Sequence, residues 1–169
     1  DHAGTGWENL SYDFADDVTG ALDSVTVIFD LGTMGDAEGN AADWTFYYDE
    51  ITTPATAEEE VVGGGSTSTT DFEADPQSYT FNDFDGGAAV VLANPDATGI
   101  NTSAQVGQMT KSAGQTWGGS TMTLATPAAI PANSMITMKV WASRAVPVLV
   151  KFDDMDAERT ANHTGSGWE

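Results

Sequence analysis

Short runs in which apolar and polar residues alternate recur along the whole chain and constrain its fold most. The run SVTVIFDL, residues 24–31, places Val25, Val27 and Phe29 on one side of an extended strand, because successive strand residues point to opposite faces. Similar runs, bounded by Gly, Pro, Asn or Asp, lie at 9–14, 44–51, 79–84, 88–93, 105–110, 120–125, 134–143 and 146–152. This period predicts an all-β fold, an antiparallel β-sandwich of jelly-roll type with about ten strands.

The composition favours a single secreted domain. The chain has 169 residues, enough for one sizeable core, and no cysteine, so disulfides and thiol chemistry are excluded. Its net charge of −21 predicts no binding to nucleic acid, and no apolar stretch reaches the roughly 18 residues of a membrane span. Dissolved salt screens the repulsion between the many negative charges of the chain. We therefore expect an extracellular or cell-surface protein of a marine or halophilic microbe.

The two ends of the chain carry nearly the same motif. Residues 1–8 read DHAGTGWE and residues 162–169 read NHTGSGWE, which share a histidine, two glycines, a tryptophan and a glutamate in register. One period of a tandem array leaves such a pattern. We predict one β-sandwich unit of an array, whose repeated ends meet at a junction or pair with neighbouring copies. The motif residues assigned to this assembly are Trp7, His163, Trp168 and Glu169.

An internal spacer supports the same tandem-array interpretation. Residues 51–70, ITTPATAEEEVVGGGSTSTT, combine a proline, an acidic run and three consecutive glycines, a composition typical of a flexible linker. The spacer divides the chain into residues 1–50, interpreted as the C-terminal half of a module, and residues 71–169, interpreted as the N-terminal half. An ordinary long surface loop is the alternative interpretation.

Several stretches of the chain resemble a known family. They are FNDFDGGAAVVLANPDATGINTSAQVGQM (81–109), GQTWGGSTMTL (114–124), MKVWASRAVPVLVKF (138–152), GWENLSYDF (6–14), VTVIFDLG (25–32) and WTFYYDEI (44–51). Together they resemble the carbohydrate-binding-module-like β-sandwich repeats of secreted bacterial proteins, the galactose-binding-like jelly rolls of the family 4 and 9 type. In this family the order runs from a DFE-type strand to a YYDEI-type strand. Here the block that ends in YYDEI, with the stretches at 6–14, 25–32 and 44–51, comes first in the chain.

Calcium is the metal that the resemblance implies. Modules of this kind hold a structural Ca²⁺ between their first and last strands, which singles out Glu73, Asp75 and Asp49 as ligands. Calcium takes about six to eight oxygen ligands, and acidic clusters occur at 71–75, 83–85, 49–50 and in the loop 35–43. None of them has the EF-hand spacing. The alternative is that these acids are solvated surface residues.

Catalysis fits the sequence poorly. The two histidines, the lack of cysteine and the lack of a serine-centred elbow leave little for nucleophilic chemistry. Nothing resembles the closely spaced acidic strand motif of jelly-roll glucanases, although a glycosidase needs only two carboxylates. We therefore predict that the chain is not an enzyme.

Aromatic side chains are the candidates for glycan binding, because pyranose C–H groups pack on an indole while flanking polar groups bind the hydroxyls. Alternation puts Trp141 opposite the core face of its run, so it either binds a ligand or lies under a loop. Trp117 lies in the Gly-rich turn GQTWGGS, whereas the facing of Tyr47 in WTFYYDEI stays open. The predicted glycan-binding residues are Trp141, Trp117, Arg144, Gln115 and Lys139.

Two functions follow from these features. The first is a non-catalytic glycan-binding module, for a neutral glucan because the acidity disfavours anionic polysaccharides. The second is a structural repeat of a surface adhesin, fibre or filament, in which calcium and strand exchange join neighbouring copies. The alternative interpretation of Trp7 and Trp168 is that they are packing residues at the start of a strand.

Overall fold

The computed structural model describes residues 6–14, 20–53, 68–73, 79–130, 135–152 and 156–165, and these form eleven strands and no helix. The strands are β1 (Trp7–Asp13), β2 (Gly20–Phe29), β3 (Thr45–Thr53), β4 (Ser68–Thr70), β5 (Thr80–Phe84), β6 (Gly87–Ala93), β7 (Gln105–Lys111), β8 (Gly119–Ile130), β9 (Met135–Trp141), β10 (Val146–Phe152) and β11 (Ala157–His163). No described segment is a helix able to cross a membrane. Three predicted site residues, Asp75, Trp168 and Glu169, lie outside the described residues.

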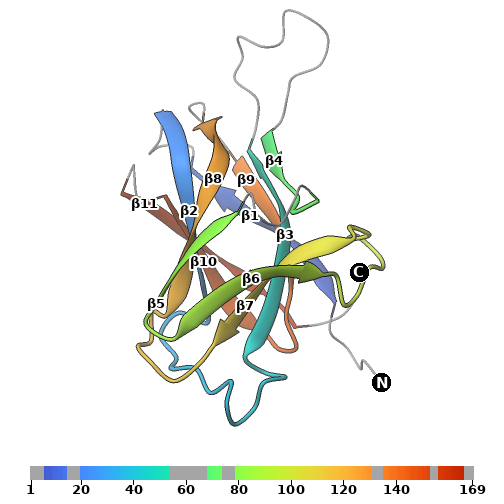
Figure 1. Ribbon diagram of the computed structural model, residues 1–169, viewed down its shortest axis with the longest axis vertical. Coiled ribbons are helices and arrows are strands. Elements are labelled where there is room, and N and C mark those ends of the chain that lie inside the picture. The colour runs from blue at the N-terminus through green and yellow to red at the C-terminus, as the bar shows by residue number, and fades with distance from the viewer. Residues whose placement is uncertain are drawn as a thin grey trace, which may run out of the picture.

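The strands form two antiparallel sheets packed face to face (Figure 1). Sheet A has the order β1-β9-β3-β7-β6, with β4 paired to β3, and sheet B has the order β11-β10-β2-β8-β5. The predicted all-β fold and antiparallel β-sandwich are therefore confirmed. Both sheets combine strands from the beginning and from the end of the chain, so the two sequence halves interleave in one sandwich.

The core lies between the sheets and follows the alternation in the sequence. Val25, Val27 and Phe29 of β2 are each no more than 2% exposed. Phe29 of sheet B stacks on Phe46 of sheet A, with ring centroids 4.7 Å apart and an interplanar angle of 2°. Each large apolar side chain buried in this way contributes roughly 1.5–3 kcal/mol. Interlocking of the two inner faces is thus the main source of stability.

The predicted spacer is shorter than residues 51–70. Residues 51–53 complete β3, and Ser68–Thr70 form β4, which pairs with them so that Ile51 lies opposite Thr70. Ile51 is 4% exposed and belongs to the core. Both predicted boundaries therefore fall inside strands, and residues 54–67 lie outside the described residues.

Strand β11 is absent from the sequence prediction. Its sequence, AERTANH, lacks an apolar alternation, and only Ala157 and His163 of its seven residues are buried. It is an edge strand, held by backbone pairing with β10 from Val146↔His163 to Phe152↔Ala157. Its partner strand, rather than its own composition, determines that it is extended.

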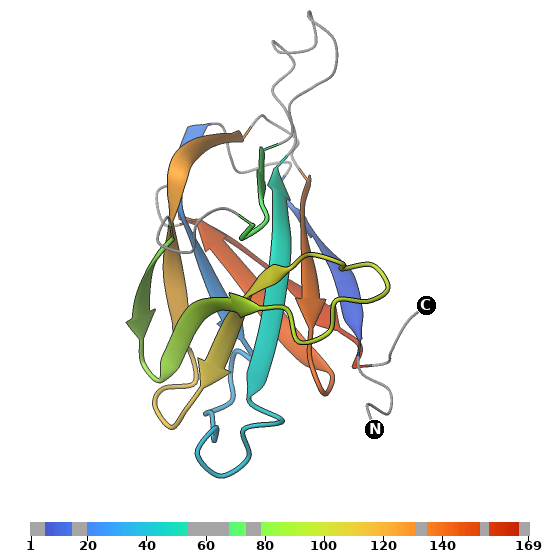
Figure 2. The ribbon, with the colours of Figure 1, turned by 45° about the vertical axis from the view of Figure 1, so that its right-hand side comes forward.

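Three loops meet at one end of the sandwich (Figure 2). They are residues 30–44 between β2 and β3, 112–118 between β7 and β8, and 142–145 between β9 and β10. The backbone N–H of Gly32 donates to the carbonyl oxygen of Thr116 at 3.1 Å, which joins the first loop to the second. These loops reach both outer faces of the sandwich.

Candidate functional site

Each sheet carries a hollow on its outer face. Hollow A, on sheet A, has a volume of about 440 Å³ and is lined by Ala41, Ala42, Thr45, Tyr47, Gln108, Trp141 and Ser143. Hollow B, on sheet B, has a volume of about 370 Å³ and is lined by Thr26, Ile28, Leu31, Phe84, Trp117, Thr121, Leu149, Lys151 and Glu158. The core separates the two hollows.

Hollow A is built by the register of three neighbouring strands. On β3, Phe46 and Tyr48 point into the core, so Tyr47 between them points outward. Tyr47 pairs with Trp141 of β9 on one side and with Gln108 of β7 on the other. The rings of Tyr47 and Trp141 meet edge to face, with centroids 5.2 Å apart and an interplanar angle of 66°. Two rings and an amide therefore share one surface.

The described residues that line hollow A carry no charged side chain. Its polar groups are hydroxyls and an amide, from Thr45, Ser143, Tyr47 and Gln108, whereas the whole chain carries a net charge of −21. A hollow with an uncharged, aromatic and hydroxyl-rich lining is suited to a neutral polar ligand.

Trp141 lies on the outer face, as alternation predicts, but it is only 7% exposed. It packs with Trp7 and Val106 in a small apolar cluster outside the main core. The indole N–H of Trp7 donates to the carbonyl oxygen of Asp96 at 2.9 Å, so the loop between β6 and β7 is tied to this cluster. Tyr47, which is half-buried, is therefore the more accessible ring of hollow A.

Hollow B is dominated by Trp117, which is 49% exposed. Its indole N–H donates to Asp85 Oδ2 at 2.7 Å, and this bond fixes the orientation of the ring. Asp85 and Gly86 form the two-residue turn from β5 to β6, and both have a positive φ, 52° and 94°. Ile28 and Leu149 form an apolar floor, 8% and 3% exposed.

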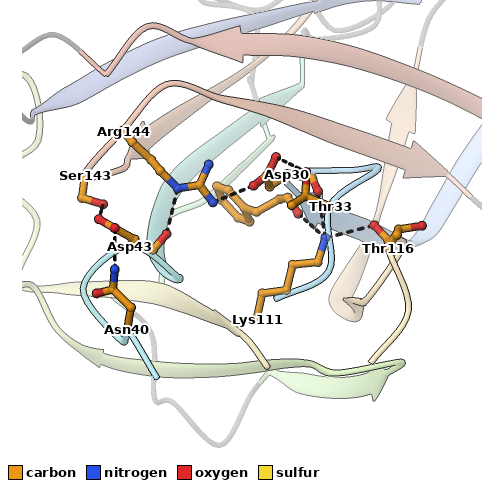
Figure 3. A network of polar contacts seen from close by, with 9 residues as sticks. Asp30, Thr33, Asn40, Asp43, Lys111, Thr116, Ser143 and Arg144 are labelled. Atoms are coloured by element: carbon orange, nitrogen blue, oxygen red, sulfur yellow. Dashed lines mark hydrogen bonds and ion pairs between the residues drawn. The ribbon is translucent and has the colours of Figure 1, made fainter. Parts of the chain in front are cut away.

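A network of buried polar contacts holds the loops beside both hollows (Figure 3). Lys111, fully buried, donates from Nζ to the carbonyl oxygens of Phe29 and Asp30 at 2.9 Å each and of Thr116 at 3.0 Å. Burial, opposed by the nearby carboxylate of Asp30, lowers the pKa of Lys111 to about 8. The ammonium group thus fastens the start of loop 30–44 to the residue before Trp117.

Arg144 extends this network toward hollow A. It donates from Nη2 to Asp30 Oδ2 at 2.6 Å and from Nε to the carbonyl oxygen of Asp43 at 3.2 Å, while its guanidinium carbon lies 4.5 Å from the centre of the Trp44 ring. Ser143 donates to Asp43 Oδ1 at 3.3 Å. We call Asp30, Asp43, Lys111, Ser143 and Arg144 the loop brace.

The structure does not bring the five predicted glycan-binding residues together. Trp141 and Trp117 lie in different hollows on opposite sheets. Arg144 belongs to the loop brace, Lys139 pairs with Glu50, and the exposed Gln115 lines neither hollow. The sequence alone does not assign Gln108 to a site and leaves the facing of Tyr47 open, because the pairing of β3 with β7 and β9 is what places both residues beside Trp141.

Of the predicted calcium ligands, Asp49 has the surroundings that suit a cation best. It is fully buried, and its Oδ1 accepts the backbone N–H of Glu50 at 2.8 Å, whereas its Oδ2 has no hydrogen-bond partner among the described residues. Burial raises the pKa of Asp49 to about 6, and the polar side chains of Ser103 and Asn101 nearby partly oppose this shift. A buried carboxylate with an unused oxygen fits a cation ligand.

Glu73 lies in the same region but is exposed. Its Oε1 accepts the backbone N–H of Gln105 at 2.9 Å. Burial raises the pKa of Tyr79, and the negative charges of Asp71, Asp49 and Glu73 add to this shift. The part of the chain that the structure describes contains no cluster of three or more metal-ligating side chains. Asp49 and Glu73 are therefore an incomplete ligand set.

The repeated ends of the chain meet in the structure. His163, 1% exposed, accepts the backbone N–H of Gly165 at Nδ1, and its Nε2 lies 3.0 Å from the carbonyl oxygen of Gly6. Nε2 therefore carries the proton. The backbone N–H of Thr164 donates to Glu8 Oε2 at 2.9 Å. The first half of one motif copy thus lies against the second half of the other, while Trp7 begins β1 as a packing residue.

Comparisons of the chain with models of protein families, with curated proteins and with solved structures give no match.

Proposed function

We propose that this chain is a non-catalytic module that binds a neutral glycan, a glucan in the first instance, in hollow A. The observation that carries the proposal is an uncharged hollow with two aromatic rings and several hydroxyl and amide groups, in a chain with a net charge of −21. A pyranose packs its C–H face against the ring of Tyr47, and Gln108, Thr45 and Ser143 offer hydrogen bonds to its hydroxyls. An anionic polysaccharide is repelled by the surrounding acids.

The extracellular setting belongs to the same proposal. A glycan-binding module meets its polysaccharide outside the cell, and salty water screens the repulsion within a chain of net charge −21. The described residues that line hollow A include no histidine or carboxylate, which supports binding without hydrolysis.

Calcium has a structural role in this proposal. Asp49 and Glu73 would bind Ca²⁺, with Asp75 as a further ligand from the sequence. Keeping Asp49 ionised at neutral pH while its pKa is about 6 costs on the order of 3 kcal/mol, and a bound cation offsets this cost. Asn101 and Ser103 lie in the loop between β6 and β7, whose Asp96 accepts a hydrogen bond from Trp7. The ion would therefore fix the loop that contacts the Trp7 and Trp141 cluster.

Affinity electrophoresis tests the binding proposal. Gels that contain laminarin, hydroxyethyl cellulose or a soluble mixed-linkage β-glucan should retard the protein, and Tyr47→Ala and Gln108→Ala should each weaken this retardation. Met135→Ala is the matched control, because Met135 is 53% exposed on the same outer face and lines neither hollow. Unchanged retardation in both hollow A variants would refute the proposed site.

A second function, a structural repeat subunit of an adhesin or filament, is favoured by the meeting of the repeated ends. His163 and Thr164 contact Gly6 and Glu8, and the same Gly-Trp-Glu sequence follows Gly165 after a single serine. A neighbouring copy could therefore supply the segment that contacts His163. Sedimentation in high salt with calcium checks this function: a species that stays monomeric at all concentrations excludes it.

A further inference from the structure

We infer that hollow B is a second glycan site, independent of hollow A, so that a single chain cross-links two glycan molecules. This inference rests on the proposed function, because it assigns the same class of ligand, a neutral glucan, to the opposite face of the sandwich.

The two hollows use opposite faces of the molecule. In sheet B, Val25 and Val27 point into the core, so Thr26 and Ile28 line hollow B from outside. In sheet A, Tyr47 lines hollow A while its neighbours are core residues. Two glycan molecules can therefore be bound at the same time without touching each other.

Trp117 provides hollow B with a fixed aromatic platform. About half of the side chain is accessible, and the 2.7 Å hydrogen bond to Asp85 holds the indole in place before any ligand arrives. A platform that is already ordered loses little conformational entropy on binding. The indole lies beside the apolar floor of Ile28 and Leu149, and a sugar ring stacked on it covers both.

Polar groups surround this platform. Thr26 and Thr121 share a hydrogen bond of 2.6 Å between their hydroxyl oxygens, and Lys151 lies opposite Glu158 in the pairing of β10 with β11. Sugar hydroxyls both donate and accept, so they can bind the carboxylate and the ammonium group alike. The two opposite charges cancel, and the site therefore suits a neutral ligand rather than an anionic one.

The loop brace keeps both hollows open together. Lys111 binds the carbonyl of Thr116, next to Trp117, and of Asp30, next to Leu31 of hollow B, while Arg144 and Ser143 bind Asp43 beside hollow A. Both loops are anchored to one buried network. Binding in one hollow therefore needs no movement that would close the other.

Calorimetry and turbidity test the inference with four proteins. The wild type should bind two equivalents of a short oligosaccharide from the retarding glucan and should form a turbid, cross-linked suspension with the soluble polymer. Trp117→Ala and Tyr47→Ala should each bind one equivalent and remain clear with the polymer. Met135→Ala should behave as the wild type. Thermal melting of each variant checks that it is folded.

The outcomes separate the inference from the proposed function. If the wild type binds one equivalent and only Tyr47→Ala abolishes binding, hollow B is not a site and the proposed function stands. If either single variant still cross-links the polymer, cross-linking arises from self-association and the inference fails. If the wild type binds no glucan, the proposed function fails and the inference fails with it.

Discussion

Two buried ionisable residues, Lys111 and Asp49, occupy contrasting environments in the same β-sandwich. Both side chains are fully buried. The ammonium group of Lys111 donates to three backbone carbonyls, so the chain itself satisfies all of its donors. The carboxylate of Asp49 has one oxygen bonded and one oxygen without a partner among the described residues.

This difference separates a buried charge whose hydrogen-bonding groups are all satisfied by the chain from one that is satisfied only in part. Burial favours the neutral form of each group: it lowers the pKa of Lys111 to about 8 and raises the pKa of Asp49 to about 6. At Lys111 the carbonyl oxygens compensate for lost hydration. At Asp49 the compensation is partial, and in the proposed calcium role a bound cation would supply the rest. Four predictions, from the largest effect to the smallest, test this contrast.

The largest effect is expected from Lys111→Met. The substitution removes the ammonium group that joins the carbonyls of Phe29, Asp30 and Thr116. We expect a loss of about 3–5 kcal/mol in the free energy of unfolding, measured by urea denaturation. Lys139→Met, which breaks only the partly exposed pair with Glu50, should cost less than about 1 kcal/mol. Equal losses in the two variants would show that the hydrogen bonds from Lys111 to the three carbonyls do not contribute to stability.

Calcium should have the next largest effect. At a concentration about 100 times its Kd, a ligand that binds only the folded state adds about 2.7 kcal/mol, so we expect Ca²⁺ to raise Tm and a chelator to lower it. Asp49→Asn should abolish this response, whereas Glu158→Gln, far from Asp49 in sheet B, should keep it. An identical melting curve with and without chelator would contradict the proposed role of calcium.

A pH effect should report on Lys111. Its folded pKa of about 8 lies below the ordinary value of 10.5, so between these values the unfolded chain binds more protons than the folded chain. The free energy of unfolding must then rise with pH in this window, by roughly 2 kcal/mol between about pH 8 and pH 9.5. Urea denaturation at several pH values, with Lys111→Met as the reference, measures this slope. A difference between the two proteins that falls with pH would contradict the prediction.

The smallest effect is expected from Arg144→Lys. Lysine keeps the charge near Asp30 but loses the planar group that bonds Asp43 and packs on Trp44. We expect a loss of about 1 kcal/mol in stability, together with weaker glucan retardation, because Asp43 and Ser143 lie beside hollow A. Calcium should stabilise this variant as much as the wild type. A variant that loses its calcium response would show that the two buried sites are coupled.

The sequence by itself determined the architecture and the inner face of most strands. Alternation is a local property, and a strand with one apolar side has one way to face a core, so Val27, Phe29 and Val140 could be placed from their neighbours alone. The same rule placed Trp141 on the outer face. Strand β11 escaped prediction because an edge strand needs no apolar pattern to pair.

Only the tertiary structure decided which outward side chains share a surface. Tyr47, Gln108 and Trp141 come from three strands far apart in the sequence, and their meeting depends on strand order and register, which alternation does not encode. The same applies to Lys111, which looks like a surface lysine in the sequence but is enclosed by carbonyls of residues as distant as Phe29. Which residues face inward follows from local chemistry, whereas the partners of each residue follow from how the chain is threaded through two sheets.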